Sequence, residues 1–230
     1  MRKRNIRRVI VLNFFVVLSF VTKAQLSIGI KGGPDFGRLL DAEEVYTGSG
    51  GTEQLNAKSR TFFYGGVFAD IPLSKANMFY LRPQLEYVGA GGQTPLLLDY
   101  SGNAISLSTK YSLHYIDLPV QFLFSPTLGI IKPWVGAGLY GGVLLSGTAK
   151  EGTNSPNHLL IGSQSNDDVE RYDFGYTFTA GLSLKWGFLV GGDFQQGLKR
   201  ISSPSGSGGP TPNTRNSVLG VHVGYKWTIK

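Results

Sequence analysis

The amino-acid sequence predicts an all-β fold, an eight-stranded antiparallel up-and-down transmembrane β-barrel. Apolar and polar residues alternate with period two along several segments, as they do in strands whose two faces meet different surroundings. Short and long connections between these segments alternate without exception, and a cationic, apolar leader precedes them all. Glycine is abundant, with 32 residues, and charged residues make up only 16%, a composition that favours strands and turns.

The leader has the order of a cleavable secretory signal peptide. A cationic start is followed by an apolar run from Val9 to Val21, and a short polar stretch then closes on the small residue Ala24. The run is too short for a membrane-spanning helix, although a retained anchoring helix is the alternative. We therefore predict a signal peptide over residues 1–24 and a barrel domain over residues 25–230.

The formal net charge of +7 belongs mostly to this leader. Six of the 22 basic residues precede Gln25 and none of the 15 acidic ones does, so 16 basic and 15 acidic residues remain, a net charge of about +1. A nearly neutral barrel domain lacks the electrostatic footprint of a nucleic-acid-binding protein. The chain has no cysteine, so neither a disulfide framework nor a lipidated residue after Ala24 is expected.

The first four predicted strands differ in clarity. The first alternates well only at Leu26, Ile28 and Ile30, and the second is aromatic on both faces. The third sets Leu85 and its apolar neighbours against Arg82 and other polar residues, and the fourth has the same two-faced pattern. In chain order these strands are 25–37, 61–71, 79–87 and 115–124.

The last four predicted strands include the clearest of all. In it one face is wholly apolar or aromatic from Tyr172 to Trp186, and the other is polar or tiny. The strand before it and the final strand alternate in the same way, whereas the remaining one is rich in glycine. In chain order these strands are 131–145, 171–186, 188–198 and 219–229.

The connections carry independent information about topology. Alternating short and long links put all tight turns at one end of the sheet and all long loops at the other, as transmembrane barrels do with their periplasmic and extracellular ends. Both termini are then periplasmic. The short links are 73–77, 125–129 and 186–187, and the long links are 39–60, 92–107, 148–170 and 199–215.

Residue size distinguishes the two faces of the strands. Bulky Leu, Val, Phe and Tyr occupy the apolar face, whereas Gly, Ser, Thr and single charges dominate the other. An eight-stranded barrel has room inside only for interdigitated side chains, so we expect small and ionic residues inside and bulky ones against lipid. Because an open edge in hydrocarbon would leave backbone groups unsatisfied, the first and last strands should pair.

Three aromatic residues support the membrane interpretation. Trp186, Tyr225 and Trp227 lie near predicted periplasmic strand ends, where an aromatic girdle is expected. The alternative is that they are core residues of a soluble, lipocalin-like barrel.

Several stretches of the chain also match a known pattern. They are the leader end TKAQ, then IGIKGGPDFG, FADIPLSKANMFYLRPQLEYVGAGG, YIDLPVQFLF followed by IIKPWVGAGLYGG, and LGVHVGYKW. With them the sequence resembles the PorT-like family of outer-membrane β-barrel proteins of the Bacteroidota type. The resemblance implies the outer membrane of a Gram-negative bacterium, export through the inner membrane, and recognition by the barrel-insertion machinery. Such barrels commonly finish on an aromatic residue, whereas this chain continues past Trp227 to Lys230.

The inward faces of the predicted strands carry charges of both signs. Because an isolated buried charge is expensive, we expect these residues to pair into a charge network, with Arg82 and Glu86 in one ladder that closes the pore. A proton or solute path is the alternative. The predicted network consists of Lys31, Asp70, Arg82, Glu86, Asp117, Lys132, Asp173, Lys185, Asp193, His222 and Lys226.

A second set of basic residues falls at the predicted outer strand ends. There they could contact lipopolysaccharide phosphates through charge-assisted hydrogen bonds, or they could simply keep the loops soluble. The candidates are Arg38, Arg60, Lys110, Arg171, Lys199 and Arg200, with Lys150 and Arg215 at the same level.

No motif indicates catalysis, a metal site or a cofactor. The histidines are scattered, no serine sits in a G-x-S-x-G elbow, and His114 near Ser112 is the only hint of a lipid-modifying enzyme. We therefore predict a monomeric, non-catalytic barrel with a structural or surface-interaction role, whose partners are outer-membrane lipid and lipopolysaccharide. The alternatives are an accessory factor in protein secretion that contacts secretion-system components, a small-solute channel and, least favoured, a lipid-modifying enzyme.

Overall fold

The computed structural model describes most of the chain after residue 25. The predicted signal peptide, 1–24, lies outside the described residues. Those described are 26–40, 44–48, 51–55, 57–74, 76–94, 97–98, 104–106, 108–164, 167–202 and 213–229.

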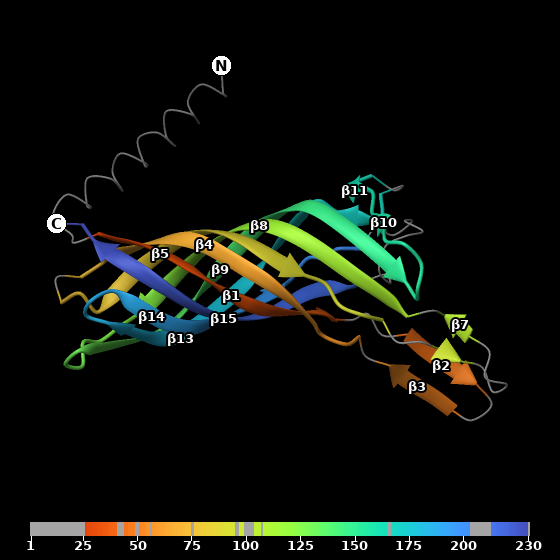
Figure 1. Ribbon diagram of the computed structural model, residues 1–230, viewed down its shortest axis with the longest axis horizontal. Helices are drawn as coiled ribbons and strands as arrows, with labels where there is room; N and C mark the ends of the chain where they lie inside the picture. The colour runs from red at the N-terminus through yellow and green to blue at the C-terminus, as the bar shows by residue number, and fades with distance from the viewer. Residues whose placement is uncertain are drawn as a thin grey trace, which may run out of the picture.

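Eight long antiparallel strands form a closed barrel (Figure 1). The first strand pairs with the last, so that Ile28 lies opposite Trp227, and no long strand is left with a free edge. This closure confirms the predicted fold class. The strands are β1 (Ser27–Leu40), β4 (Arg60–Pro72), β5 (Phe79–Ala90), β8 (Thr109–Phe124), β9 (Ile131–Glu151), β13 (Tyr172–Leu184), β14 (Phe188–Gly197) and β15 (Arg215–Thr228). In the described part of the chain, no helix is long and apolar enough to cross a membrane.

The tight links and the long links lie at opposite ends of the barrel. The link between β13 and β14 is a hydrogen-bonded turn in which the amide of Gly187 donates to the carbonyl of Leu184 at 2.9 Å. Gly187 has a φ of 104°, a conformation that favours glycine. Figure 1 shows the C-terminus at this end, which we call the periplasmic end, and the short strands of the long links at the other, outer end.

The long links were predicted as loops, and this expectation is wrong in part. They contain short strands because residues there pair locally, as Tyr46 does with Glu53. The additional strands are β2 (Glu44–Gly48), β3 (Gly51–Leu55), β6 (Leu97–Leu98), β7 (Ala104–Ser106), β10 (Asn157–His158), β11 (Ile161–Gly162) and β12 (Val169–Glu170).

Several barrel strands are longer than the alternation predicts, most of all β8 and β9. β8 begins at Thr109 instead of Tyr115, and β9 ends at Glu151 instead of Leu145. In β8 buried and more exposed side chains keep alternating through His114, but toward the outer end the apolar residues, such as Leu113, lie on the inner face. The β8–β9 register also shifts there, with the extra residue in β9. The outer ends of β8 and β9 were therefore not predicted as strand from the sequence.

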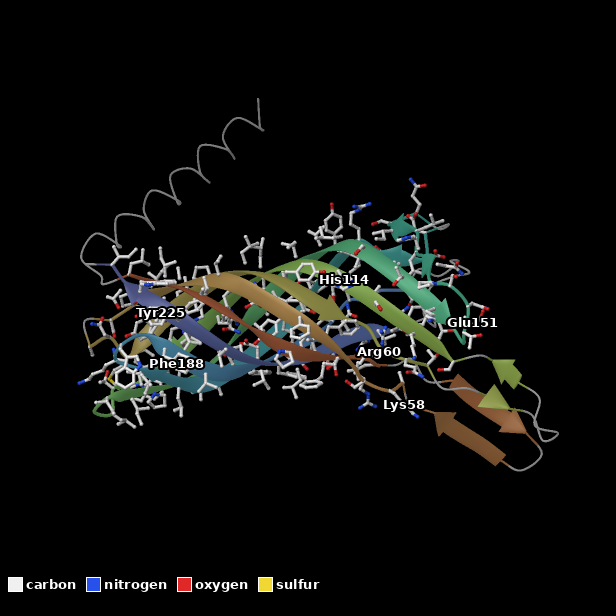
Figure 2. All side chains as sticks on the ribbon, viewed as in Figure 1. Lys58, Arg60, His114, Glu151, Phe188 and Tyr225 are labelled. Atoms are coloured by element: carbon white, nitrogen blue, oxygen red, sulfur yellow. The ribbon has the colours of Figure 1, made fainter. Side chains whose placement is uncertain are left out.

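The exterior of the barrel is an apolar belt. Large hydrophobic side chains on all eight strands point outward, among them Phe63 with 76% and Leu139 with 68% of its surface exposed. Figure 2 shows carbon-rich side chains along the outside of the barrel, with Phe188 and Tyr225 near its periplasmic end. So large an exposed apolar surface is stable only in contact with lipid or another apolar partner.

Candidate functional site

The middle of the barrel interior holds a buried ion cluster. Lys31 Nζ lies 2.7 Å from Glu86 Oε1 and 2.6 Å from Asp193 Oδ2, and all three side chains are almost completely buried. His222 Nδ1 lies 3.0 Å from the same Asp193 oxygen and 2.6 Å from the Tyr64 hydroxyl. One lysine from β1 thus connects carboxylates from β5 and β14, across the width of the barrel.

A second ion cluster lies nearer the periplasmic end. Arg82 donates two hydrogen bonds to Asp70, from Nε at 2.6 Å and from Nη2 at 3.0 Å, and Lys226 Nζ lies 3.2 Å from the same carboxylate. The Arg82 guanidinium also lies 4.6 Å from the Phe68 ring centroid and 5.3 Å from that of Trp134. The bidentate pair and the stacking fix this arginine in one orientation.

The sequence places Arg82 and Glu86 in one ladder, but the structure assigns them to these two separate clusters. Their partners come from different strands: Arg82 pairs with Asp70 of the adjacent strand β4, and Glu86 pairs with Lys31 of β1, one strand further on. The single-ladder expectation is therefore wrong, because alternation along one strand does not tell which neighbour each charge meets.

Two other predicted interior acids, Asp117 and Asp173, form no salt bridge with any described residue. Asp173 accepts hydrogen bonds from the Tyr140 hydroxyl at 3.2 Å and from Asn216 Nδ2 at 3.0 Å. Asp117 is buried on β8, and its Oδ1 has no hydrogen-bond partner among the described residues. Asp35, which the sequence analysis missed, is also buried and accepts a hydrogen bond from the amide of Gly89 at 3.2 Å.

Two predicted network lysines stay outside the network. Lys185 is exposed in the turn after β13, and Lys132 is half-buried at the start of β9 without a salt bridge to any described residue. Expecting them to pair was wrong because both lie at the barrel mouth, where water replaces a counter-ion. Of the eleven predicted residues, Lys226 is also half-buried, and the remaining eight are buried.

An apolar cluster fills the interior toward the outer end. Small and ionic residues are expected inside from the sequence, and this expectation is wrong there. Side chains from the outer strand ends meet side chains from the long links, such as Leu159, Val169 and Ile201. Its buried members are Leu39, Ala57, Tyr64, Val88, Ala90, Tyr111, Leu113, Tyr115, Leu144, Leu159, Val169, Ile201 and Val218, and we call it the outer plug.

The interior between the outer plug and the central ion cluster is nearly solid. A cavity of about 10 Å³ lies there, bordered by Asp35, Tyr64, Glu86, Val88 and Asp193 among others. A space of this size holds about one water molecule. The described side chains therefore leave little free space around this cavity.

Glycines make room for the large side chains that point inward. A Cβ atom at Gly181 would collide with the Trp134 indole, and one at Gly191 would lie 2.7 Å from its Cζ2 atom. A Cβ atom at Gly141, by contrast, would meet no atom within 4 Å.

We expect Gly181→Val to lower the free energy of unfolding by roughly 1–3 kcal/mol, because it overpacks the interior against Trp134. Gly141→Val is the matched control and should cost clearly less. Urea titration of the folded protein in detergent micelles measures both. Equal losses in the two variants would show that Trp134 does not occupy this space.

The predicted outer basic residues all lie at the outer end, but several have partners. Arg60 Nη1 donates to Ser112 Oγ at 2.7 Å, Arg171 Nη2 to the carbonyl of Ile161 at 3.1 Å, and Lys199 Nζ to Glu170 at 3.0 Å. Those exposed to solvent are Arg38, Lys110, Arg171 and Arg200.

The pair of residues that hinted at catalysis is not assembled as a catalytic pair. His114 Nδ1 lies 2.9 Å from the Tyr87 hydroxyl, and Ser112 Oγ is engaged by Arg60. Figure 2 shows His114 on the barrel wall and Arg60 at the outer strand end. In the part of the chain that the structure describes, no group of three or more His, Asp or Glu side chains is placed to hold a metal ion.

The predicted girdle residues lie together at the periplasmic end. Trp186, Tyr225 and Trp227 are all exposed, and the rings of Tyr225 and Trp227 are 5.0 Å apart. A closed antiparallel barrel with an apolar exterior and an ionic interior defines the class of transmembrane β-barrel proteins.

The chain belongs to the family of the outer membrane protein beta-barrel domain, whose model matches residues 19–203. Its place is therefore the outer membrane. No curated protein is significantly similar in sequence.

Several solved structures have a similar chain path at low sequence identity. Ail of Yersinia pestis is 10% identical, with 88% of this chain and 99% of that chain covered and a TM-score of 0.41. OprG of Pseudomonas aeruginosa is 10% identical, with 90% and 98% covered and a TM-score of 0.43. Neisserial surface protein A is 13% identical, with 88% and 97% covered and a TM-score of 0.42.

Proposed function

We propose that this protein is a non-conducting, non-catalytic outer-membrane barrel that holds its outer links as an interaction surface at the cell exterior. The outer plug is the observation that carries the proposal. Leu113, Leu144 and Ile201 are completely buried where a channel would need its outer mouth. The long links and their short strands extend beyond this plug, so the barrel can act as a platform for them (Figure 1). The leader would direct export of the chain through the inner membrane.

The purified, refolded protein is expected to give no steady single-channel current in planar bilayers, because the plug and the ion clusters fill the lumen. A porin reconstituted in parallel shows that the bilayers report conductance, and a heat-dependent mobility shift shows that the barrel is folded. Large, steady currents from the folded protein would contradict the proposal of a closed platform.

Lipopolysaccharide is the surface partner that the outer basic residues favour. Lys110 and Arg200 are exposed and form no salt bridge with any described residue, so their charges are available to phosphate groups. Each basic side chain near an anionic membrane surface contributes about 1 kcal/mol.

We expect Lys110→Gln with Arg200→Gln to weaken lipopolysaccharide binding roughly tenfold to thirtyfold, in line with that contribution per charge. The control is Lys132→Gln with Lys185→Gln, which removes the same charge at the periplasmic end and should leave lipopolysaccharide binding unchanged. Binding is measured by titration of the detergent-solubilised proteins. Equal affinity of the outer double variant and the unmodified protein would refute this contact.

The PorT-like resemblance supports a second candidate, an accessory role in protein secretion. Its motifs run through the strands that build the ion clusters, including Lys31 and Arg82. Deletion of the gene followed by profiling of secreted proteins tests this role. An unchanged profile of secreted proteins would contradict the accessory role in secretion and leave the platform proposal unaffected.

A further inference from the structure

The periplasmic mouth of the barrel carries an unbalanced set of positive charges. Lys132, Lys185 and Lys226 line one cavity of about 530 Å³. Asp70 is the one acidic residue that the described part of the chain places near it, and it is already paired with Arg82 and Lys226. Among the described residues, these three lysines and Arg82 against Asp70 leave a net charge of +3 at this end.

Backbone hydrogen bonds hold the lysine-bearing segments together. The amide of Lys185 donates to the carbonyl of Ile130 at 3.0 Å, which connects the β13–β14 turn to the residue before β9. The amide of Lys226 donates to the carbonyl of Gly187 at 2.9 Å, which connects the same turn to β15. The lysines therefore start from fixed backbone positions, and a ligand need not order the segments that carry them.

Two of the three lysines lack a counter-ion among the described residues. Neither Lys132 nor Lys185 forms a salt bridge with a described residue, and Lys132 is close enough to Lys226 for their charges to repel. An anion in the cavity would relieve this repulsion and provide several charge-assisted hydrogen bonds. A phosphate group suits the site because it offers several acceptor oxygens to lysines that converge from different strands.

Aromatic residues place this cavity at the level of the lipid headgroups. Trp186, Tyr225 and Trp227 border it and are also exposed on the barrel exterior. Exposed tryptophan and tyrosine side chains prefer the membrane–water interface. We infer that the periplasmic mouth is a phosphate-binding site, occupied by the headgroup of an anionic phospholipid from the inner leaflet of the outer membrane.

The test is a titration of the folded, detergent-solubilised protein with phosphatidylglycerol, followed by native mass spectrometry. Phosphatidylcholine serves as the zwitterionic comparison. Lys132→Gln with Lys185→Gln should lower the affinity for phosphatidylglycerol roughly tenfold to thirtyfold. Lys110→Gln with Arg200→Gln, which removes the same charge at the outer end, should change it less than about twofold.

Competition with inorganic phosphate distinguishes the two sources of the ligand. Displacement of the lipid by millimolar phosphate would assign the site to phosphate groups in general, and retention of the lipid would assign it to headgroups. An unchanged affinity of the Lys132 and Lys185 double variant, or an equal loss in the outer double variant, would overturn the inference. For lipopolysaccharide, the outer double variant is expected to bind more weakly and the Lys132 and Lys185 double variant to bind unchanged, so this inference and the surface proposal can fail independently.

Discussion

Replacing Lys31 with methionine is expected to lower the free energy of unfolding by about 3–5 kcal/mol, the largest effect of any single substitution considered for this barrel. Lys31 is the cation that pairs with both Glu86 and Asp193 at distances of 2.7 and 2.6 Å. Methionine keeps most of the side-chain volume, so the loss reports the uncompensated carboxylates and not a cavity. Urea titration in lipid vesicles, followed by tryptophan fluorescence, measures it.

A charge-neutral version of the same cluster separates the two contributions. Adding Glu86→Gln and Asp193→Asn to Lys31→Met removes the unpaired carboxylates and should recover a large part of the lost stability. Lys110→Met, at an exposed outer position, is the matched control and should change stability by less than about 0.5 kcal/mol. Lys31→Met with the stability of that control would contradict the buried ion cluster.

Replacing Leu139 with arginine is expected to cost roughly 2–4 kcal/mol, because the side chain lies near the middle of β9 on the lipid-facing belt. Leu139 is 68% exposed, so in water the same change would be almost without effect. The loss of unfolding free energy therefore reports whether the barrel exterior meets hydrocarbon or water, and not a loss of side-chain packing. Unfolding titrations in lipid vesicles, with the insertion yield as a second readout, provide the measurement.

Leu160→Arg is the matched control for this substitution. Leu160 is 61% exposed but lies in the outer link that follows β10. There the new charge meets water, and a change within about 0.5 kcal/mol is expected. Similar costs at both leucines would mean that the belt around β9 does not face hydrocarbon.

The sequence alone predicts the eight barrel strands because each strand has one face toward lipid and the other toward the lumen. Where one face meets lipid and the other a crowded lumen, every second residue must change character, as from Tyr172 to Leu184. The alternating link lengths then determine the topology. A strand with one lipid-facing and one lumen-facing side can therefore be predicted from its own sequence, without knowing which strands pair with it.

The outer plug escaped prediction because its members do not obey this rule. Leu113 and Leu144 point inward although they are bulky and apolar, so at the outer ends of β8 and β9 the expected assignment of the two faces is reversed. The plug also draws on Leu159, Val169 and Ile201, which lie in or beside links that have no strand pattern. Contacts between links that are far apart in the sequence produce no alternating pattern, so they could not be predicted from it.

The interior charges could be assigned to a face but not to partners. Alternation puts Lys31 and Glu86 inside, yet only the folded barrel brings together strands that are not adjacent in the wall. The same alternation would have included Asp35, four residues after Lys31 on the same face of β1. Lys185 was wrongly included because β13 ends at Leu184, just before it.

Which side chains touch hydrocarbon can be measured directly, because the chain has no cysteine of its own. Single cysteines are introduced along β9 from Trp134 to Val143, labelled with nitroxide, and their collision with lipid-dissolved oxygen is measured in reconstituted vesicles. Val135, Leu139 and the other odd-numbered positions should be accessible to oxygen, whereas even-numbered positions such as Tyr140 should be shielded. Uniform accessibility along the strand, or high values at the even-numbered positions, would contradict a barrel with its bulky side chains in lipid.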